Sequence, residues 1–394
     1  MRYRNVSLEA FGYTLPPEIV TSAEIECRLA PLYERLRLPQ GRLEVMTGIR
    51  ERRLWAPGTL PSDKSIESGE KALAAAGLDR RHVGALVHAS VCRDHLEPAT
   101  ACRVHHGLRL PRDCMVYDVS NACLGLLNGV VQVANMIELG QIRAGLIVGS
   151  EGSRQLLETT IDTLNRDTSL TRRQMKRAVA SLTIGSGSCA ILLTDRELSR
   201  TDNRLLAGVA RANTAFHDLC HSGRDEAVGP GMQPLMETDS ERLMHEGIAT
   251  GAETFQQFLA EAHWTRDDVQ KTFCHQVASA HRKLTLETLG LDPRNDFTTL
   301  EWLGNTGSVA LPITMAIGLQ QGFVPGEEQI AMLGIGSGIN CLMLATHWRR
   351  TLVCSDLDQA GQAPATRRMK PDARLRATGG QGVADGRWSE GVTR

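Results

Sequence analysis

The feature that most constrains the fold is an internal repeat of two apolar strands with a helix between them. The first strand-like run, Val83–Ser90, recurs in kind as Val269–His275, and the glycine-ended run Ala144–Ser150 recurs as Ala331–Ser337. These runs are almost continuously apolar, which is typical of strands in a sheet that is covered on both faces. The repeat therefore predicts a duplicated α/β unit.

A helix with small residues at its start lies between the two strands of each copy. The helix starts are Cys123–Gly129 in the first copy and Thr306–Pro312 in the second. Asn305 follows Cys123 by 182 positions, and the ends of the second strands are 187 positions apart. A common offset for strand, helix and strand predicts that the helices of both copies pack between two sheets.

Cys123 is the strongest candidate for a catalytic residue. It lies in a turn between an apolar strand and the helical run Leu124–Leu139. A thiol at a helix start is close to the positive end of the helix dipole and to unpaired backbone N–H groups, which favour the nucleophilic thiolate. A packed core cysteine is the alternative. It is disfavoured because two other segments carry groups suited to serve a thiolate: Phe273–His281, with His275, and Trp302–Ser308, with Asn305.

Together these motifs resemble the thiolase superfamily, in its ketoacyl synthase III branch. Cys123, His275 and Asn305 occur in the family's order, and Thr47–Arg52 and the glycine-rich Gly334–Gly338 match it as well. The resemblance covers roughly residues 5–350. It implies a five-layered αβαβα fold, a homodimer, and acyl transfer onto the cysteine followed by carbon–carbon bond formation.

The repeat and the resemblance divide the chain into three parts. Residues 1–200 form the N-terminal half with the nucleophile and include a segment, 151–180, that belongs to neither copy. Residues 201–352 form the C-terminal half, and a second segment outside the repeat is expected at 203–265. Such segments either line a substrate channel or decorate the surface, and the sequence leaves both open. Residues 353–394 turn polar and are predicted to be a disordered tail.

Glu97 decides between two reactions. It precedes Cys123 by 26 positions, in the loop after the first core strand. A decarboxylating synthase forms its carbanion by losing CO₂, whereas the condensation of two ordinary acyl thioesters requires a base for the α-proton. The segment Leu96–Thr100 resembles that of the OleA-type enzymes of bacterial long-chain olefin synthesis, which join two fatty acyl-CoAs head to head. In that family the glutamate reaches the active site of the partner subunit. A solvated loop charge is the alternative for Glu97.

The candidate residues can be assembled into a mechanism. Cys123 accepts the first acyl group, and the backbone N–H groups of Cys123 and Ser337 stabilise the oxyanion. Glu97 of the partner subunit removes the α-proton of a second acyl-CoA, while His275 Nε2 and the Asn305 amide stabilise the enolate. The predicted function is the non-decarboxylative Claisen condensation of two long-chain fatty acyl-CoAs to a β-ketoacyl-CoA or β-keto acid for olefin synthesis. The alternative is a decarboxylating 3-oxoacyl-acyl carrier protein synthase III that uses an acyl-CoA and malonyl-acyl carrier protein.

Composition and charge exclude several other classes. A net charge of −1 over 394 residues gives no reason to expect a nucleic-acid or anionic-membrane partner. The ten cysteines are irregularly spaced, without a C-x-x-C pair and without an apolar N-terminal signal segment, so reduced thiols in the cytoplasm are expected. No apolar stretch reaches the length that spans a bilayer. The expected partners are fatty acyl-CoA substrates, a second copy of the chain and downstream enzymes of the olefin pathway.

No cofactor and no metal are expected. His217 and His221 are spaced as ligands on one face of a helix, with Cys220 between them, but no fourth ligand cluster accompanies them. The glycine-rich Gly185–Ser188 and Gly334–Gly338 lack the full dinucleotide-binding spacing.

Two further sets of residues receive interpretations. The basic residues Arg50, Arg52 and Arg53 are suited either to CoA phosphates or to a solvated face. His281 is interpreted as an ordinary packed or hydrogen-bonded histidine.

Overall fold

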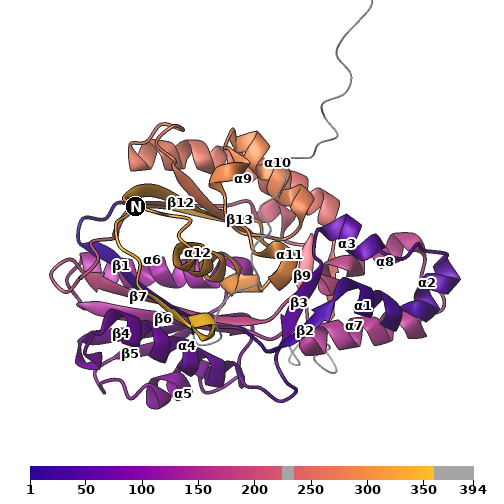
Figure 1. The fold of residues 1–394 in the computed structure, drawn as a ribbon, viewed down its shortest axis with the longest axis horizontal. Coiled ribbons are helices and arrows are strands. Elements are labelled where there is room, and N and C mark those ends of the chain that lie inside the picture. Colours follow the sequence, from indigo (N-terminus) through magenta and orange to yellow (C-terminus); the bar gives the residue numbers. More distant parts are fainter. Residues whose placement is uncertain (224–234, 359–394) are drawn as a thin grey trace, which may run out of the picture. The chain divides into compact units, whose positions relative to one another are not determined.

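The computed structural model describes residues 1–223 and 235–358, and two sheets with similar connectivity dominate it (Figure 1). The first sheet has the strand order β1-β7-β6-β4-β5, and the second has the order β11-β12-β13-β8. Only one residue pair, Ser7 with Arg204, joins β1 to β8. The strands of the first sheet are β1 (Val6–Thr14), β4 (Val83–Ala89), β5 (Met115–Val119), β6 (Ala144–Glu151) and β7 (Gly187–Asp195). Those of the second are β8 (Arg204–Ala212), β11 (Lys271–Cys274), β12 (Glu328–Gly336) and β13 (Asn340–Trp348).

The pairing of the strands confirms the repeat seen in the sequence. In the first sheet β4 pairs parallel with β6, β6 antiparallel with β7, and β7 antiparallel with β1. In the second sheet β11 pairs parallel with β12, β12 antiparallel with β13, and β13 antiparallel with β8. Each strand of the second set therefore has a counterpart in the first. In the second half, a parallel bridge joins Thr272 of β11 to Asp296. It corresponds to the parallel pairing of β4 with β5 in the first half.

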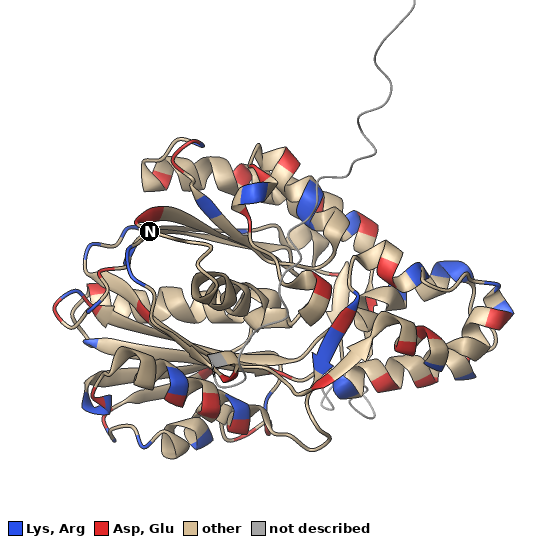
Figure 2. Cartoon of the chain, viewed as in Figure 1, with Lys and Arg blue, Asp and Glu red and all other residues tan. Residues whose placement is uncertain are grey.

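Helices cover both faces of each sheet and give the predicted five layers, α-β-α-β-α (Figure 1). The outer layer on the first sheet consists of α4 (Pro61–Ala76) and α5 (Thr100–Gly107), and the outer layer on the second consists of α9 (Ser240–Ala262) and α10 (Ser279–Leu289). The layer between the sheets holds α6 (Gly125–Glu138) and α12 (Ala310–Gln320). Helix α12 carries no charged residue (Figure 2) and is buried from Ala310 to Leu319, as expected of a helix with apolar neighbours on all sides.

Two boundaries differ from the sequence-based expectation. The segment 203–265 was expected outside the repeat, but β8 and α9 belong to the core of the second half, since β8 corresponds to β1 and α9 to α4. The apolar patterns of β8 and α9 differ from those of β1 and α4, so the sequence repeat did not reveal that these elements correspond. The predicted tail also begins later than expected: Val353–Ser355 forms β14, which pairs parallel with β1. Residues 359–394, which hold most of the predicted tail, lie outside the described residues.

A side lobe packs beside the layered core and has its own hydrophobic cluster (Figure 1). Segment 151–180 supplies α7 and α8 to this lobe, and residues 18–54 supply the rest. Capping boxes begin α1 and α8, with Thr21 and Thr171 as the N-caps. The elements of the lobe are β2 (Glu18–Thr21), α1 (Ser22–Arg28), α2 (Ala30–Leu36), α3 (Arg42–Thr47), β3 (Glu51–Leu54), α7 (Arg154–Arg166) and α8 (Arg172–Ala178).

Two short elements complete the description around the site. The hairpin of β9 (Cys220–Ser222) and β10 (Met236–Thr238) lies after β8, and α11 (Leu300–Leu303) precedes α12. Among the described residues, no helix combines the length and the apolar character that a membrane crossing requires.

Candidate active site

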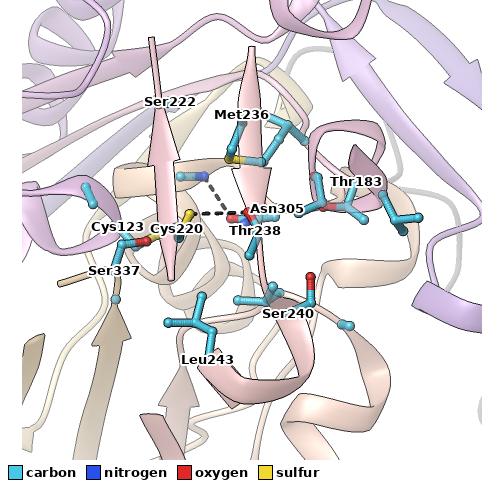
Figure 3. Close-up of a pocket in the computed structure, with 18 of the residues that line it drawn as sticks. Cys123, Thr183, Cys220, Ser222, Met236, Thr238, Ser240, Leu243, Asn305 and Ser337 are labelled. Carbon is cyan, nitrogen blue, oxygen red and sulfur yellow. Dashed lines mark hydrogen bonds between the residues drawn. The ribbon is translucent and has the colours of Figure 1, made fainter. Parts of the chain in front are cut away.

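A cavity of about 1070 Å³ lies where helix starts and strand ends of the two halves meet. Four of the five predicted catalytic residues line it, namely Cys123, His275, Asn305 and Ser337. Both segments that were expected either to line a channel or to decorate the surface contribute to its wall: Leu156 and Val179 come from 151–180, and Met236 and Leu243 come from the later segment (Figure 3). These parts of the chain therefore line the cavity, which favours the channel alternative over surface decoration.

Cys123 is held by a strained turn. It lies in the 3₁₀ turn η2 (Ala122–Leu124), which leads directly into α6. Ala122, the residue before it, has φ +43°, in the left-handed region that a residue with a Cβ adopts only at a cost. The surrounding core determines this conformation, and it fixes the position of the thiol in the cavity wall.

The Cys123 thiol is protonated at rest. Burial raises its pKa to about 12, with smaller contributions from Cys220 and Glu151, and the backbone N–H groups of Ser337 and Cys123 only partly oppose this rise. The expectation that the helix start favours the thiolate is thus outweighed by burial. Cys123 must give up its proton during acylation.

The Ser337 turn approaches Cys123 through glycines. The Ser337 N–H is close enough to lower the pKa of the Cys123 thiol, and the two residues lie side by side in Figure 3. A Cβ on Gly336 would lie 3.4 Å from the Cβ of Cys123, and one on Gly338, which has φ +134°, would lie 2.3 Å from Asn340 Nδ2. Glycine at these positions lets the backbone donor reach the reacting sulfur.

Two asparagines, whose role the sequence did not reveal, join the turns that carry these donors. Asn340 Nδ2 donates to the Ser337 carbonyl at 3.1 Å and to Asn121 Oδ1 at 3.3 Å. Asn121 Nδ2 in turn donates to Asn128 Oδ1 at 2.7 Å. The network connects the Cys123 turn to the Ser337 turn and so holds their two N–H groups in a fixed relation. The adjacency of Asn121 to the nucleophile was a signal that could have pointed to it.

His275 presents a neutral imidazole to the cavity. His275 follows β11 and is 2% exposed. Its backbone N–H donates to the Leu333 carbonyl at 3.0 Å. Burial lowers its pKa to about 3, with a smaller contribution from His281. Neither ring nitrogen has a hydrogen-bond partner among the described residues. A neutral ring with both nitrogens available can accept a proton at one of them and donate from the other.

The amide of Asn305 is oriented by its own turn. Its Oδ1 accepts a hydrogen bond from the Gly307 N–H at 3.0 Å, drawn as a dashed line in Figure 3. Its backbone is also fixed, because the Asn305 N–H donates to Thr183 O at 3.0 Å and Gly185 N–H donates to Asn305 O at 2.9 Å. With the oxygen engaged, the Nδ2 amide is the end left to donate to an oxygen atom in the cavity.

Glu97 is the one predicted catalytic residue that the chain does not bring to its own cavity. It is exposed on the loop of residues 91–99 between β4 and α5, and it is not among the residues that line the cavity. Val91 and Leu96 on the same loop are 44% and 48% exposed. The chain alone therefore assembles the nucleophile with His275, Asn305 and Ser337, and leaves the carboxylate on the surface.

The basic residues at the cavity are not those that the sequence suggested. Arg52 is fully buried and donates to Ser22 Oγ and to the Val20 and Leu182 carbonyls, so it holds the side lobe together and neither faces solvent nor reaches a phosphate. The cations that line the cavity, among the described residues, are on or beside α8: Arg173, Lys176 and Arg177.

The structure also places the other histidines that the sequence analysis considered. His281 lines the cavity beside His275, and burial lowers its pKa to about 4. His221 and Cys220 lie in strand β9, so the helix face on which His217 and His221 would have shared a metal ion does not exist.

Comparisons with known proteins agree with this arrangement. Residues 259–348 match the 3-oxoacyl-[acyl-carrier-protein (ACP)] synthase III C-terminal family. The chain is 42% identical over 351 residues to the acyl-CoA:acyl-CoA alkyltransferase of Shewanella oneidensis, with 88% of this chain and 100% of the relative covered. It is 33% identical over 348 residues to the acyl-CoA:acyl-CoA alkyltransferase of Xanthomonas campestris, again with 88% and 100% covered.

Solved structures of Xanthomonas campestris OleA have the same fold. The cerulenin-bound structure matches with a TM-score of 0.83 at 33% identity, covering 88% of this chain and 98% of that chain. A variant with bound lauric acid and lauroyl-CoA matches with a TM-score of 0.82 at 32% identity, covering 88% and 100%. Other structures of that protein are variants at a glutamate, at a cysteine 26 positions after it, and at a histidine. This chain belongs to the acyl-CoA:acyl-CoA alkyltransferase family, the OleA-type condensing enzymes of the thiolase superfamily.

Proposed function

We propose that this enzyme joins two long-chain fatty acyl-CoAs head to head, without decarboxylation, and that the product is a β-ketoacyl-CoA or the β-keto acid formed from it. The observation that carries the proposal is the position of Glu97: a carboxylate on an exposed loop, 26 residues before Cys123, outside the cavity of its own chain. The Xanthomonas campestris enzyme has a glutamate and a cysteine at the same separation.

The first step is acylation of Cys123. His275 accepts the thiol proton as the sulfur attacks the carbonyl carbon of the first acyl-CoA, and the N–H groups of Cys123 and Ser337 stabilise the oxyanion. The C–S bond to CoA then breaks, and the proton held by His275 passes to the departing CoA thiolate. The acyl group remains on Cys123 as a thioester.

The second step forms the carbon–carbon bond. Glu97 of the partner subunit takes the α-proton of a second acyl-CoA, and His275 and the Asn305 Nδ2 amide donate hydrogen bonds to the enolate oxygen. The enolate carbon attacks the acyl carbon on Cys123, and the bond from that carbon to sulfur breaks. The proton that Glu97 took from the α-carbon then passes through solvent to the Cys123 thiolate, which restores both the thiol and the carboxylate.

A homodimer would bring Glu97 to a second cavity. Strand β5 is the last strand of the first sheet in the described part of the chain, and Met115 at its start is 53% exposed. The exposed side chains of Val91 and Leu96 lie on the loop that follows β4, the neighbour of β5. An unpaired strand edge with exposed apolar side chains beside it is suited to a second copy of the same surface related by a two-fold axis.

The cavity fits the substrates by size and charge. Its volume exceeds the usual range of about 300–1,000 Å³ for small-molecule sites, and its wall is mainly apolar, as two alkyl chains require. Arg173, Lys176 and Arg177 supply positive charge for the CoA phosphates. The irregular spacing of the ten cysteines, without a C-x-x-C pair, supports the cytoplasm as the compartment.

The reaction is tested by supplying a long-chain acyl-CoA as the only substrate. We expect CoA release and a β-keto product without any malonyl donor. Glu97→Gln keeps the shape of the side chain but cannot accept the α-proton, so Cys123 should still acquire an acyl group, detected by intact-mass spectrometry, while condensation nearly stops.

Two outcomes would contradict the proposal. A requirement for malonyl-acyl carrier protein would favour the decarboxylating alternative. Normal condensation by Glu97→Gln would show that this carboxylate is not the base.

A further inference from the structure

Glu151 is a buried carboxylate in the active site to which the two chemical steps assign no role. It is the last residue of β6, its side chain is 6% exposed, and it lines the cavity with Cys123 and Asn305. A buried carboxylate is costly unless donors surround it. Its partners therefore show what the charge is for.

One set of donors comes from the turn that carries Asn305. Ser308 Oγ donates to Glu151 Oε1 at 2.5 Å, and the Ser308 N–H reaches the same oxygen at 3.4 Å. Gly307, which lies between Asn305 and Ser308 in the sequence, packs so close to Glu151 that a Cβ on it would be 3.3 Å from Glu151 Cγ. Gly307 is also the residue whose N–H orients the Asn305 amide. The carboxylate thus fixes the turn on which the direction of Asn305 Nδ2 depends.

The other set of donors comes from the loop that carries Glu97. The Val91 N–H donates to Glu151 Oε1 at 3.1 Å, and the Cys92 N–H donates to Oε2 at 3.3 Å. These are the first two residues of the loop 91–99. Farther along, Asp94 accepts from the Ser62 N–H at 3.0 Å, so the loop is fastened before Glu97 is reached. Glu151 sets where this loop leaves the sheet.

We propose that Glu151 is a positioning residue with two arms, one that holds the Asn305 turn of its own active site and one that holds the loop that delivers Glu97. This rests on the proposed function, in which Glu97 serves the cavity of the partner subunit. The two arms then act on different active sites of the dimer, because the Asn305 arm serves the chain's own site and the loop arm serves the partner's.

A direct role for Glu151 in proton transfer fits the contacts less well. Both oxygens already accept hydrogen bonds, from three backbone N–H groups and one hydroxyl. Its negative charge also opposes formation of the Cys123 thiolate, since it contributes to the raised pKa of that thiol. Removing the charge should therefore not slow acylation, whereas loosening the two arms should slow condensation.

The first test compares the two steps in Glu151→Gln. The amide keeps the size of the side chain but replaces a charged acceptor with a neutral one, which weakens the hydrogen bonds of both arms, and its NH₂ group opposes at least one of the donors. We expect condensation to fall by about 10²-fold, as for a misplacement near 1 Å, with no decrease in the rate of acylation of Cys123. Ser90→Ala is the matched control, because it removes a buried hydrogen bond of 2.8 Å from Ser90 Oγ to the carbonyl of Ser150, the neighbour of Glu151, and leaves the four hydrogen bonds to the Glu151 carboxylate in place. Equal losses in both steps, or a loss in Ser90→Ala as large as that in Glu151→Gln, would overturn the proposal.

The second test separates the arms in heterodimers, purified through two different tags after co-expression. A dimer of Cys123→Ala with Glu97→Gln keeps one working site, in which the Glu97→Gln subunit supplies Cys123 and the other supplies Glu97. Glu151→Gln should lower condensation whichever of the two subunits carries it. Ser308→Ala removes the hydroxyl of the Asn305 arm, together with its 3.2 Å hydrogen bond to the Ala89 carbonyl, and leaves the Val91 and Cys92 donors of the loop arm in place. It should therefore lower condensation only from the subunit that supplies Cys123.

The outcomes distinguish this proposal from the function on which it rests. If Glu151→Gln acts from only one subunit while the parent heterodimer is active, the two-arm proposal is wrong and the proposed function stands. If the parent heterodimer forms but is inactive, Glu97 does not act across the interface. In that case the loop arm cannot act on the partner's site either, and both proposals are wrong on this point. Should Glu151→Gln fail to fold, Ser308→Ala in the homodimer decides, since unchanged condensation in that variant would rule out the Asn305 arm.

Discussion

The two halves of the core share one connectivity but provide different chemistry at equivalent places. Each central helix begins after a 3₁₀ turn with a functional residue in or just before it: Cys123 lies in the turn before α6, and Asn305 lies two residues before the turn Gly307–Val309 that leads into α12. In each half a strand end contacts the helix start of the other half: β12 ends beside Cys123, and β6 ends beside Ser308. At the end of β12, the backbone N–H of Ser337 can donate to an oxyanion. At the end of β6, the carboxylate of Glu151 accepts hydrogen bonds from the turn that contains Ser308. A duplicated backbone thus supports unlike roles because the side chains at a few strand and helix ends differ.

Replacing the functional residue of the first half should have the largest effect. Cys123→Ala removes the nucleophile with little change in volume, so condensation should be abolished while the protein stays folded. Intact-mass spectrometry after mixing the wild type with an acyl-CoA should show one acyl group that maps to Cys123. Residual condensation in the Ala variant, or an acyl group on another of the ten thiols, would contradict the assignment.

Replacing the functional residues of the second half should slow the reaction without abolishing it. His275→Ala and Asn305→Ala should each lower condensation by about 10²- to 10³-fold, the range for loss of one donor to an oxyanion. The two variants should differ in acylation, because a thiol with a pKa of about 12 needs His275 to accept its proton, whereas Asn305 acts only on the enolate. Single-turnover acylation rates would show this difference, and equal acylation by both variants would remove His275 from the first step.

A smaller effect should appear in the pH dependence of stability. Burial lowers the pKa of His275 from 6.5 to about 3, so the unfolded state binds more protons than the folded state between these values. The contribution of neutral His275 to the free energy of unfolding is complete above pH 6.5 and is lost as the pH falls toward 3, with a total on the order of a few kcal/mol. In urea titrations from pH 7 to pH 4, His275→Asn should therefore lose less stability than the wild type.

The exposed His263 offers a matched control for this measurement. His263→Asn should keep the wild-type slope of stability against pH. If His275→Asn showed that slope as well, the buried imidazole would not be the source of the acid sensitivity.

Much of the fold and of the candidate site could be predicted from the sequence, because both depend on local patterns. The apolar runs Val83–Ser90 and Ala331–Ser337 carry the periodicity of buried strands, and Cys123 follows such a strand at a turn of small residues. Glu97 is singled out by the resemblance of Leu96–Thr100 to the OleA-type enzymes, because its position in a loop after a core strand fits a solvated charge equally.

What escaped prediction depends on contacts between distant segments. Burial among residues from both halves raises the pKa of the Cys123 thiol by more than the backbone N–H groups near the helix start lower it, and the extent of burial is not visible in the local sequence. Arg52 was expected at CoA phosphates or on a solvated face, and Glu151 carried no signal in the sequence. Only the folded chain shows that Arg52 is buried against Ser22 and Glu151 against Ser308. Strands β8 and β1 are equivalent because each pairs antiparallel with the corresponding strand of its sheet, β13 or β7. Their residue patterns differ, so the sequence did not reveal this equivalence.

The uncharged helix α12 has a consequence for how the chain could have arisen. It belongs to the second half, yet it packs against β7 and β1 of the first sheet as well as against β11 of its own. If the second half were produced alone, one side of this wholly apolar helix would meet water, and the fragment would aggregate rather than fold. An ancestral single unit would therefore have needed a second copy to cover the same surface. Fusion of two such units into one polypeptide would make that mutual dependence permanent, and each unit could then lose residues that the other supplies.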